Sequence, residues 1–235
     1  MTIATGLLLA AGEGSRLRDV SPYKPLCVVG GAALIDHAIG SMAAAGLTRV
    51  VVTLSYGADA ILAHLAGRAQ PLPVETVMTD HRQPNGVSAL AARAAVGSGG
   101  AVMAMCDHLV TPAHYRRLAQ IGAQDGLTLG IDRRLGHPWV DPLDVTCVAT
   151  EADRIVAIGK ELEPHDCYDT GVFAVGDRFF DALAGLTSPS LTEGVRLLAA
   201  TGRARTVDCS DLDWIDVDDA PAFGHAQAWL AQVAG

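Results

Sequence analysis

The chain has 235 residues and a formal charge of −9, from 17 lysine and arginine residues against 26 aspartate and glutamate residues. This length allows one domain with a substantial core, and an acidic chain without a basic stripe is not expected to bind nucleic acid. No apolar run reaches the ~20 residues that cross a bilayer, and the N-terminal segment lacks the basic start of a signal peptide. We therefore expect a cytoplasmic protein without membrane insertion, whose five widely spaced cysteines are buried reduced thiols.

Strands alternate with helices in the first half of the chain. Apolar segments predict strands at residues 3–9, 48–55, 73–79 and 100–106, and the segments between them predict helices at 32–45, 57–67 and 87–96. Such alternation, with short apolar strands, is typical of a parallel sheet that is covered by helices on both faces.

The pattern changes after about residue 125. Strands are predicted at 126–131, 142–149, 154–159, 167–175 and 204–208, and helices at 177–185, 190–200 and 220–233. Because fewer helices separate these strands, we expect a smaller mixed or antiparallel extension. No linker interrupts the chain, so we predict a single α/β domain over residues 1–235, with a nucleotide-binding half at about 1–110 and an acceptor-binding half at 111–235.

A glycine turn follows the first strand, in the stretch GEGSRL at 12–17. The third glycine of a dinucleotide fingerprint is replaced by Leu17, the acidic residue expected after the second strand is missing, and no Gly-Lys-Ser/Thr sequence completes a Walker loop. A plain strand-to-helix turn would explain Gly12 and Gly14 alone. However, glycines also let backbone amides approach an anion, and Arg16 and Lys24 add two cations to the same segment.

Carboxylates occur at two further positions where a strand is predicted to end. Asp107 closes an apolar strand, at the edge of an open α/β sheet where ligands bind. Asp216 and Asp218 alternate in WIDVDD and would share one face of a strand. Most aspartates are solvated loop residues or helix caps, but an acid after so apolar a strand needs a partner. Carboxylate oxygens beside phosphate suit Mg²⁺.

The segment 158–175, IGKELEPHDCYDTGVFAV, holds Lys160 beside an Asp-Thr-Gly turn. Lys160 and Lys24 are the two lysines of the chain, which suggests that a compact ammonium is needed at both positions. A local β-turn is the ordinary interpretation of Asp-Thr-Gly. Together with Lys160 it favours a site for a polyol phosphate. The stretch PNGVS at 84–88 is explained equally well as a turn with a helix cap and as a site that recognises the base of the nucleotide.

These motifs carry a resemblance to a known family. LLLAAGEGSRL…YKPL resembles the L-A-A-G-x-G-x-R-L…K-P-L signature of the nucleotidyltransferases, or pyrophosphorylases, with an extra DVSPY before the lysine; CDHL and WIDVDD resemble their acidic turn and W-x-D segment. The runs RQPNGVSALAA and IGKEL…DCYDTGVF are most similar to the CTP:inositol-1-phosphate cytidylyltransferases. The similarity extends from Leu8 to about Asp219. It implies a Rossmann-like, GT-A-like fold.

The resemblance implies transfer of CMP from CTP to a polyol phosphate, with myo-inositol 1-phosphate as the expected acceptor and CDP-inositol and pyrophosphate as products. The implied metal is Mg²⁺ on Asp107 and Asp216, with Asp218 as the weaker alternative. The implied catalytic residues are Arg16, Lys24 and Asp107. These three also belong to the nucleotide-binding set, together with Leu9, Ala10, Ala11, Gly12, Glu13, Gly14, Ser15, Asn85, Gly86 and Ser88. The acceptor-binding set is His108, Lys160, Asp169, Thr170 and Gly171; a structural role explains His108 as well.

Other readings stay open at this point. The same chemistry could join a sugar 1-phosphate to UTP or dTTP, or phosphocholine to CTP, although 3 Trp, 4 Tyr and 4 Phe residues are few for an aromatic cage around choline. Guanylyl transfer to molybdopterin is less favoured because of the inositol-type segment 158–175. A non-catalytic nucleotide-binding regulatory subunit is less favoured because the chain keeps both metal acids and the lysine. A separately encoded membrane CDP-alcohol phosphotransferase is the implied functional partner. The sequence does not distinguish a monomer from a homo-oligomer.

Overall fold

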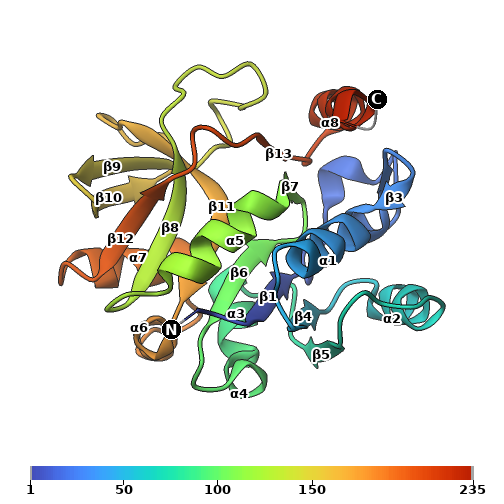
Figure 1. Cartoon of the computed structure of the whole chain (residues 1–235), viewed down its shortest axis with the longest axis horizontal. Coiled ribbons are helices and arrows are strands. Elements are labelled where there is room, and N and C mark those ends of the chain that lie inside the picture. Colours follow the sequence, from blue (N-terminus) through green and yellow to red (C-terminus); the bar gives the residue numbers. More distant parts are fainter. Residues whose placement is uncertain (1, 234–235) are drawn as a thin grey trace.

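A computed structural model describes residues 2–233. Nine strands form one sheet in the order β5-β4-β1-β6-β11-β8-β12-β10-β9. In the first half, β1 (Thr5–Leu9), β4 (Arg49–Leu54), β5 (Val74–Met78) and β6 (Ala101–Met105) are parallel. The helices between them are α1 (Leu34–Ala44), α2 (Ala58–Ala66), α3 (Asn85–Ala91) and α4 (Arg93–Val96). The predicted α/β class with a parallel first half is therefore confirmed (Figure 1).

The second half is mixed, as predicted. β11 (Cys167–Val175) runs antiparallel to both β6 and β8 (Leu127–Asp132), whereas β12 (Ala204–Asp208) is parallel to β8. β10 (Arg154–Gly159) and β9 (Cys147–Glu151) follow as antiparallel strands. β9 also pairs with the start of β11, so this end of the sheet curls back on itself. The sheet thereby wraps around one side of the molecule (Figure 1).

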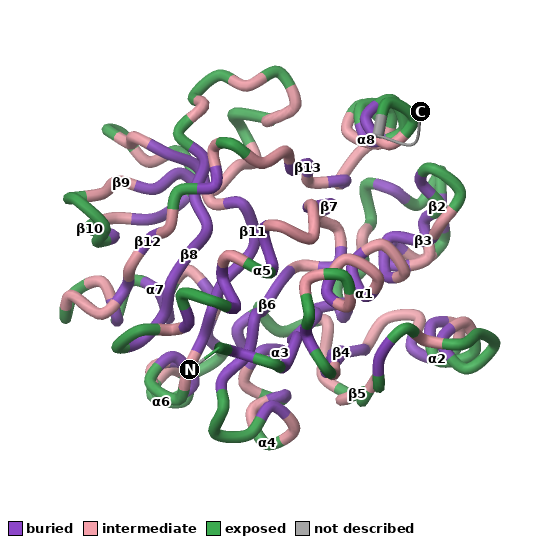
Figure 2. The backbone as a smooth tube through the Cα atoms, in the orientation of Figure 1, coloured by how far each residue is buried: buried purple, intermediate pink, exposed green. Residues whose placement is uncertain are grey.

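Two hydrophobic clusters cover the two faces of the sheet, and the side chains of β1 alternate between them. Leu8 packs with α1, α5 (Pro112–Ile121) and α8 (Ala220–Val233), whereas Leu7 and Leu9 pack with α3, α6 (Asp177–Ala184) and α7 (Leu191–Ala199). This alternation is the period of two that an extended strand imposes. Figure 2 shows the buried backbone concentrated in the central strands. None of the helices within residues 2–233 combines the length and apolarity that crossing a bilayer requires.

Several segments differ from the sequence-based expectation. The helix predicted at 87–96 begins at Asn85 and is split into α3 and α4, and the strand predicted at 142–149 begins only at Cys147. The residues before it, 133–146, contain no helix or strand and arch above the sheet at the top of Figure 1. The short β7 (His108–Val110) pairs antiparallel with β13 (Trp214–Asp216) in a separate two-stranded sheet. A β2–β3 hairpin (Val28–Val29 and Ala32–Ala33) contacts α8.

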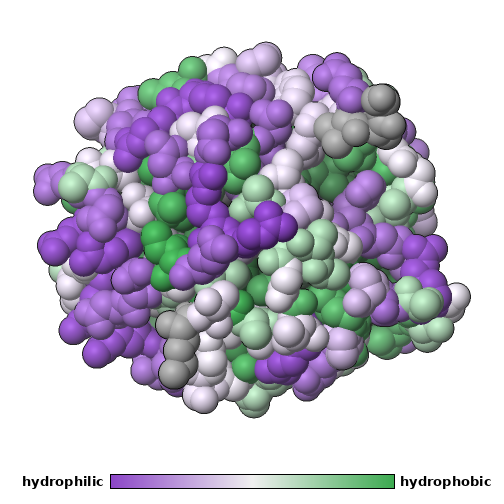
Figure 3. All heavy atoms as spheres, viewed as in Figure 1, coloured by the Kyte–Doolittle hydropathy of each residue, from purple (hydrophilic) through white to green (hydrophobic). Residues whose placement is uncertain are grey.

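The surface in Figure 3 is mainly hydrophilic over β9, β10 and β12. Apolar surface in the same view is divided among several smaller areas. A single extended apolar patch would indicate a contact surface for another protein or a membrane. The apolar surface in this view therefore does not indicate such a contact surface. Charged side chains gather instead in the concave part of the molecule.

Candidate active site

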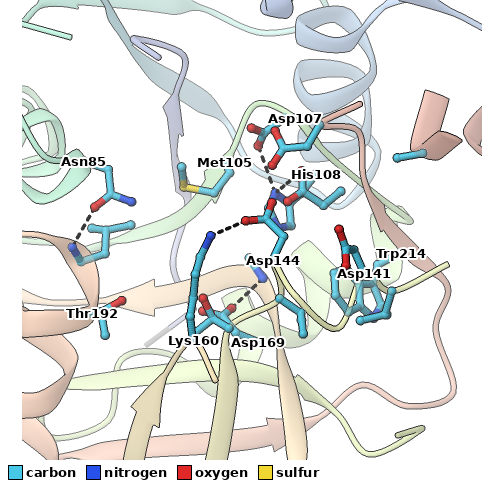
Figure 4. A pocket seen from close by; sticks show the side chains of 18 of the residues that line it. Asn85, Met105, Asp107, His108, Asp141, Asp144, Lys160, Asp169, Thr192 and Trp214 are labelled. Atoms are coloured by element: carbon cyan, nitrogen blue, oxygen red, sulfur yellow. Dashed lines mark hydrogen bonds and ion pairs between the residues drawn. The ribbon is translucent and has the colours of Figure 1, made fainter. Parts of the chain in front are cut away.

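A cavity of about 240 Å³ lies where the ends of β1 and β6 face β10, β11 and the 133–146 segment (Figure 4). Both halves of the chain contribute its charged lining, which comprises Arg16, Asp107, His108, Asp141, Asp144, Lys160, Asp169, Asp216, Asp218 and Asp219. Ligands of open α/β sheets bind at this edge, outside the carboxyl ends of the parallel strands. The structure thus gathers most of the charged residues singled out from the sequence.

The glycine turn after β1 is built around Lys24. Gly14 has a φ of 61° and precedes the 3₁₀ turn Ser15–Leu17, and a Cβ atom there would overlap the side chain of Lys24. Glycine is therefore required by both conformation and space. A Cβ atom at Gly12 would meet no atom within 4 Å, so the turn leaves open space on its outer side. That space is suited to an anion approaching backbone amides.

Lys24 lies under the cavity rather than in its lining. The residue is 8% exposed, and its ammonium pairs with Asp107, at 2.5 Å from Nζ to Oδ2, and with Asp218. A buried ammonium is stable only when carboxylates compensate its charge. Lys24 therefore links the glycine turn to both predicted acidic motifs.

Pairing between β7 and β13 brings the two acidic motifs together. His108 is opposite Asp216 in that pairing, and its Nδ1 lies 3.0 Å from Asp107 Oδ1 and 3.8 Å from Asp216 Oδ1. Burial by itself lowers the pKa of His108, but the Asp216 and Asp107 carboxylates outweigh it and raise the pKa to about 9. Burial likewise disfavours ionised Asp107, yet Lys24 and His108 hold the pKa of that carboxyl far below its usual range.

The acids fit a divalent cation. Ligand atoms of Asp107, His108 and Asp216 lie within 4.8 Å of one another, and so do those of Asp144, Asp216 and Asp218. Asp216 Oδ1 is buried without a hydrogen-bond partner among residues 2–233, and burial raises the pKa of this carboxyl. An orphaned buried carboxylate oxygen is costly unless something else satisfies it. A cation on Asp107 and Asp216 would do so.

Asp216 and Asp218 both face the cavity, with carboxylate oxygens within 4.8 Å of each other, although β13 itself ends at Asp216. The Val217 amide donates to the Asp107 carbonyl at 3.0 Å, which continues the pairing with β7 one residue past the end of β13. Asp219 then accepts a hydrogen bond from the amide of Ala222 in the first turn of α8. Asp218 pairs with Lys24 and, at 2.5 Å, with Arg16.

Trp214 anchors the W-x-D segment through Asp132, a residue that the sequence analysis does not single out. Its Nε1 donates to Asp132 Oδ2 at 2.8 Å, and Arg134 holds both carboxylate oxygens of Asp132. The Trp214 ring is also stacked on His108, with centroids 6.1 Å apart. Trp214 thus positions β13, and with it Asp216, against His108.

The Asp-Thr-Gly sequence lies within β11, which divides its residues between the cavity and the core. Asp169 lines the cavity and accepts from the Gly171 amide at 2.7 Å, and burial raises its pKa to about 6. Gly171 also lines it, and a Cβ atom there would overlap the His108 ring. Thr170 does not face the cavity: its buried hydroxyl donates to the Gly130 carbonyl at 2.9 Å. Alternation along β11 explains this correction.

The stretch PNGVS forms the start of α3, with Pro84 at the N-cap and no side-chain cap hydrogen bond. Asn85 lines the cavity, with its Oδ1 accepting from the Leu191 amide at 2.9 Å. Gly86 and Ser88 do not line it; Ser88 is buried, with its hydroxyl 3.5 Å from that of Thr79. Gly86 and Ser88 are therefore packed residues of the first turns of α3, the predicted side-chain cap is absent, and Asn85 is the member that faces the cavity (Figure 4).

Asp144, which the sequence did not single out, bridges the two halves. Its Oδ2 accepts from Arg16 Nη2 at 2.7 Å and its Oδ1 from Lys160 Nζ. Burial disfavours ionised Asp144, but hydrogen bonds from Lys160 and Arg16 lower its pKa below the usual value. The apolar lining was also missed, and includes Met105, Trp139, Ile158, Phe173, Leu191 and Val195.

Comparisons with known proteins agree with this geometry. Residues 6–150 match the MobA-like NTP transferase domain family. The bifunctional IPC transferase and DIPP synthase of Rubrobacter xylanophilus is 32% identical over 219 residues, which are 90% of this chain and 48% of that protein, so the chain spans about half the length of this relative. The N-acetylmuramate alpha-1-phosphate uridylyltransferase of Caulobacter vibrioides is 36% identical over 262 residues, with 96% of each chain covered.

A solved structure shares the fold. The inositol-1-phosphate CTP transferase from T. maritima superposes with a TM-score of 0.88 at 21% identity, covering 99% of this chain and 97% of that one. At this identity the likeness shows the arrangement of strands and helices. Taken together with the matched residues, which include the glycine turn, Lys24 and Asp107, it leads to one assignment. The chain belongs to the MobA-like NTP transferase family and is a nucleotidyltransferase.

Proposed function

We propose that the protein transfers CMP from CTP to myo-inositol 1-phosphate, with CDP-inositol and pyrophosphate as products and Mg²⁺ as cofactor. One observation carries the proposal: cationic side chains and a group of aspartates from both halves line a single cavity. The relatives support the choice of substrates, since the T. maritima protein is named as an inositol-1-phosphate CTP transferase. The inositol-type segment 158–175 also contributes Lys160, Asp169 and Gly171 to the lining.

In this proposal the first half binds the nucleotide. Amides of Gly12–Ser15 and the Arg16 guanidinium hold the triphosphate, because backbone N–H groups and a forked cation both match phosphate oxygens. Asn85 is the residue of its stretch that reaches the base. Its carbonyl is engaged by Leu191, which leaves its amide N–H groups to donate to a pyrimidine acceptor.

The metal site of the proposal is Asp107 and Asp216, with Asp218 as the weaker second choice. Asp218 is already paired with Lys24 and Arg16, whereas Asp216 keeps an unpartnered oxygen. When bound there, Mg²⁺ supplies Lewis-acid stabilisation of phosphate oxygens. Lys24 stays against Asp107 and keeps its carboxylate ionised and oriented.

The second half binds the acceptor. Lys160 pairs with its phosphate, and Asp169 and His108 contact its hydroxyls. An oxygen of that phosphate attacks the α-phosphorus of CTP in line, the bond from this phosphorus to the bridging oxygen breaks, and pyrophosphate leaves with that oxygen. No covalent intermediate on the protein is needed, so the side chains act by neutralising charge and by positioning two polyanions.

The proposal extends to the setting of the reaction. The enzyme acts in the cytoplasm, and its CDP-alcohol product is consumed by a separately encoded membrane CDP-alcohol phosphotransferase. The proposal divides the chain into residues 1–110, which bind the nucleotide, and residues 111–235, which bind the acceptor; the cations of the two parts, Arg16 and Lys160, meet at Asp144.

A second candidate is uridylyl transfer from UTP to a sugar 1-phosphate. The Caulobacter vibrioides relative, which is named for N-acetylmuramate alpha-1-phosphate, covers 96% of both chains. The apolar side chains of Ile158, Phe173 and Val195 in the cavity also suit an acetamido methyl group better than a fully hydroxylated ring.

A pyrophosphate-release screen distinguishes the candidates. The purified protein is incubated with MgCl₂ and each of CTP, UTP, GTP and dTTP, crossed with inositol 1-phosphate, N-acetylmuramate 1-phosphate, glucose 1-phosphate and phosphocholine. We expect the highest kcat/KM for CTP with inositol 1-phosphate. Highest turnover for UTP with N-acetylmuramate 1-phosphate establishes the second candidate instead. No pyrophosphate from any pair contradicts both.

A further inference from the structure

The 133–146 segment places one carboxylate between the cations of the two halves. Asp144 accepts hydrogen bonds from Arg16, which lies 128 residues before it, and from Lys160, which lies 16 residues after it. Figure 4 shows the Lys160 ammonium directed at Asp144 across the cavity. Arg16 and Lys160 are therefore both engaged before any ligand arrives.

These are the two cations to which the proposed function assigns substrate phosphates, so the inference rests on that function. Carboxylate and phosphate oxygens accept the same charge-assisted hydrogen bonds from ammonium and guanidinium groups. A cation that is paired with Asp144 is less available to a phosphate. We propose that Asp144 is an internal anion that occupies the phosphate-binding cations of the free enzyme and that each substrate must displace.

The burial of the three side chains favours displacement over permanent pairing. The side chains of Arg16 and Lys160 are 52% and 58% exposed, whereas that of Asp144 is 21% exposed. The two cations can therefore turn towards a ligand while Asp144 stays. Oxygens of Asp216 and Asp218 lie within 4.8 Å of an Asp144 oxygen. Removing its partners leaves Asp144 facing like charges, which lowers the apparent affinity for both substrates.

The competing interpretation is that Asp144 holds the cations in a productive position. The two interpretations predict opposite signs, because loss of a competitor tightens anion binding and loss of a support weakens it. Arg16 has a second partner, since its Nη2 also lies 2.5 Å from Asp218 Oδ2. Its orientation therefore does not depend on Asp144 alone, which favours competition.

The test is isothermal titration calorimetry of the intact protein and of Asp144→Asn, with CTP and inositol 1-phosphate titrated separately in EDTA and in MgCl₂. Asp141→Asn is the matched control: Asp141 lines the same cavity and accepts from the Leu143 amide, and no ion pair within residues 2–233 involves it. We expect Asp144→Asn to bind each substrate about 3- to 10-fold more tightly, as for release of partly exposed ion pairs. Asp141→Asn should change affinity less than twofold.

Unchanged or weaker binding by Asp144→Asn overturns the proposal. Weakening confined to titrations with MgCl₂ overturns it in favour of a metal-ligand role. An equal gain in Asp141→Asn also overturns it, because the effect is then one of net charge. If wild-type protein binds neither substrate, the proposed function fails, and pyrophosphate as the titrant still tests the competition at Arg16: tighter pyrophosphate binding by Asp144→Asn supports it and equal binding refutes it.

Discussion

The two lysines of the chain contact the acids of one cavity from opposite halves, and they differ in burial. Lys24 is 8% exposed and fixed between Asp107 and Asp218, in a 3₁₀ turn that packs against Gly14. The side chain of Lys160 follows β10, is 58% exposed and pairs with a residue of the irregular 133–146 segment. The first-half wall is therefore rigid around Lys24 and Asp107, although the side chain of Arg16 is 52% exposed. Lys160 on the second-half wall can adapt.

The acids of the two walls differ in the same way. Asp107 has cations on both sides, and its pKa is held low. Asp169 has no ion pair among residues 2–233 and its pKa is raised by burial. A rigid, charge-compensated wall suits the invariant triphosphate part of a nucleotide, and a less compensated wall leaves acids free for the hydroxyls of a variable acceptor.

The largest effect that this contrast predicts is that of Lys24→Ala. Removing a buried ammonium leaves Asp107 and Asp218 uncompensated, so we expect kcat to fall at least ~10²-fold and the free energy of unfolding to fall by about 3 kcal/mol. Pyrophosphate release, measured well below the Tm, and urea unfolding check the two values. Near-normal turnover in a folded variant would remove Lys24 from the catalytic site.

Gly14→Ala is expected to come next. The substitution combines a positive φ with overlap onto Lys24, so we expect a loss of about 2–4 kcal/mol in unfolding free energy. Gly136→Ala in the 133–146 segment is the control, because its φ is 75° but a Cβ atom meets nothing within 4 Å. We expect about 1 kcal/mol there. Equal losses in the two variants would contradict a rigid first-half wall.

The rigid wall is also the part that the sequence predicted best. Gly12, Arg16, Lys24 and Asp107 lie close together along the chain or at the end of an apolar strand, so local pattern places them. Asp144 could not be found in this way. It lies in a segment without periodicity, and its partner Arg16 is 128 residues away. Only tertiary packing brings such a pair together.

Other differences between the prediction and the structure have a local signal in the sequence. Thr170 was grouped with Asp169 and Gly171, although strand alternation turns it to the opposite face. The helix α5 is missing from the prediction, yet Thr111 before it, Pro112 at its first position, Gly122 after it and the buried pair Tyr115 and Leu118 are helix signals.

Asp169→Asn tests the contrast between the acids through pH. The pKa of Asp169 is raised by burial from 3.8 to about 6, so the folded state binds its proton more tightly than the unfolded state. The ionised group therefore opposes folding above pH 6, and this cost disappears as the pH falls towards 4. We expect the variant to gain on the order of 2 kcal/mol at pH 8 and nothing at pH 4. Thermal unfolding at both pH values measures this gain, and a pH-independent difference would refute it.

Lys160→Ala is expected to have the smallest effect on the molecule and the most selective effect on the reaction. An exposed ion pair contributes at most about 1 kcal/mol to stability, so the Tm should barely move. Loss of one charge-assisted contact to the acceptor phosphate should raise its KM about 10-fold, with the KM for CTP changed less than threefold. Lys160→Arg, which keeps the charge but replaces the compact ammonium by a planar guanidinium, should recover only part of the loss. Equal increases in both KM values would place Lys160 at a position shared by the two substrates. That result would contradict the division of the cavity into a rigid and an adaptable wall, because Lys160 is the residue that distinguishes the second wall from the first.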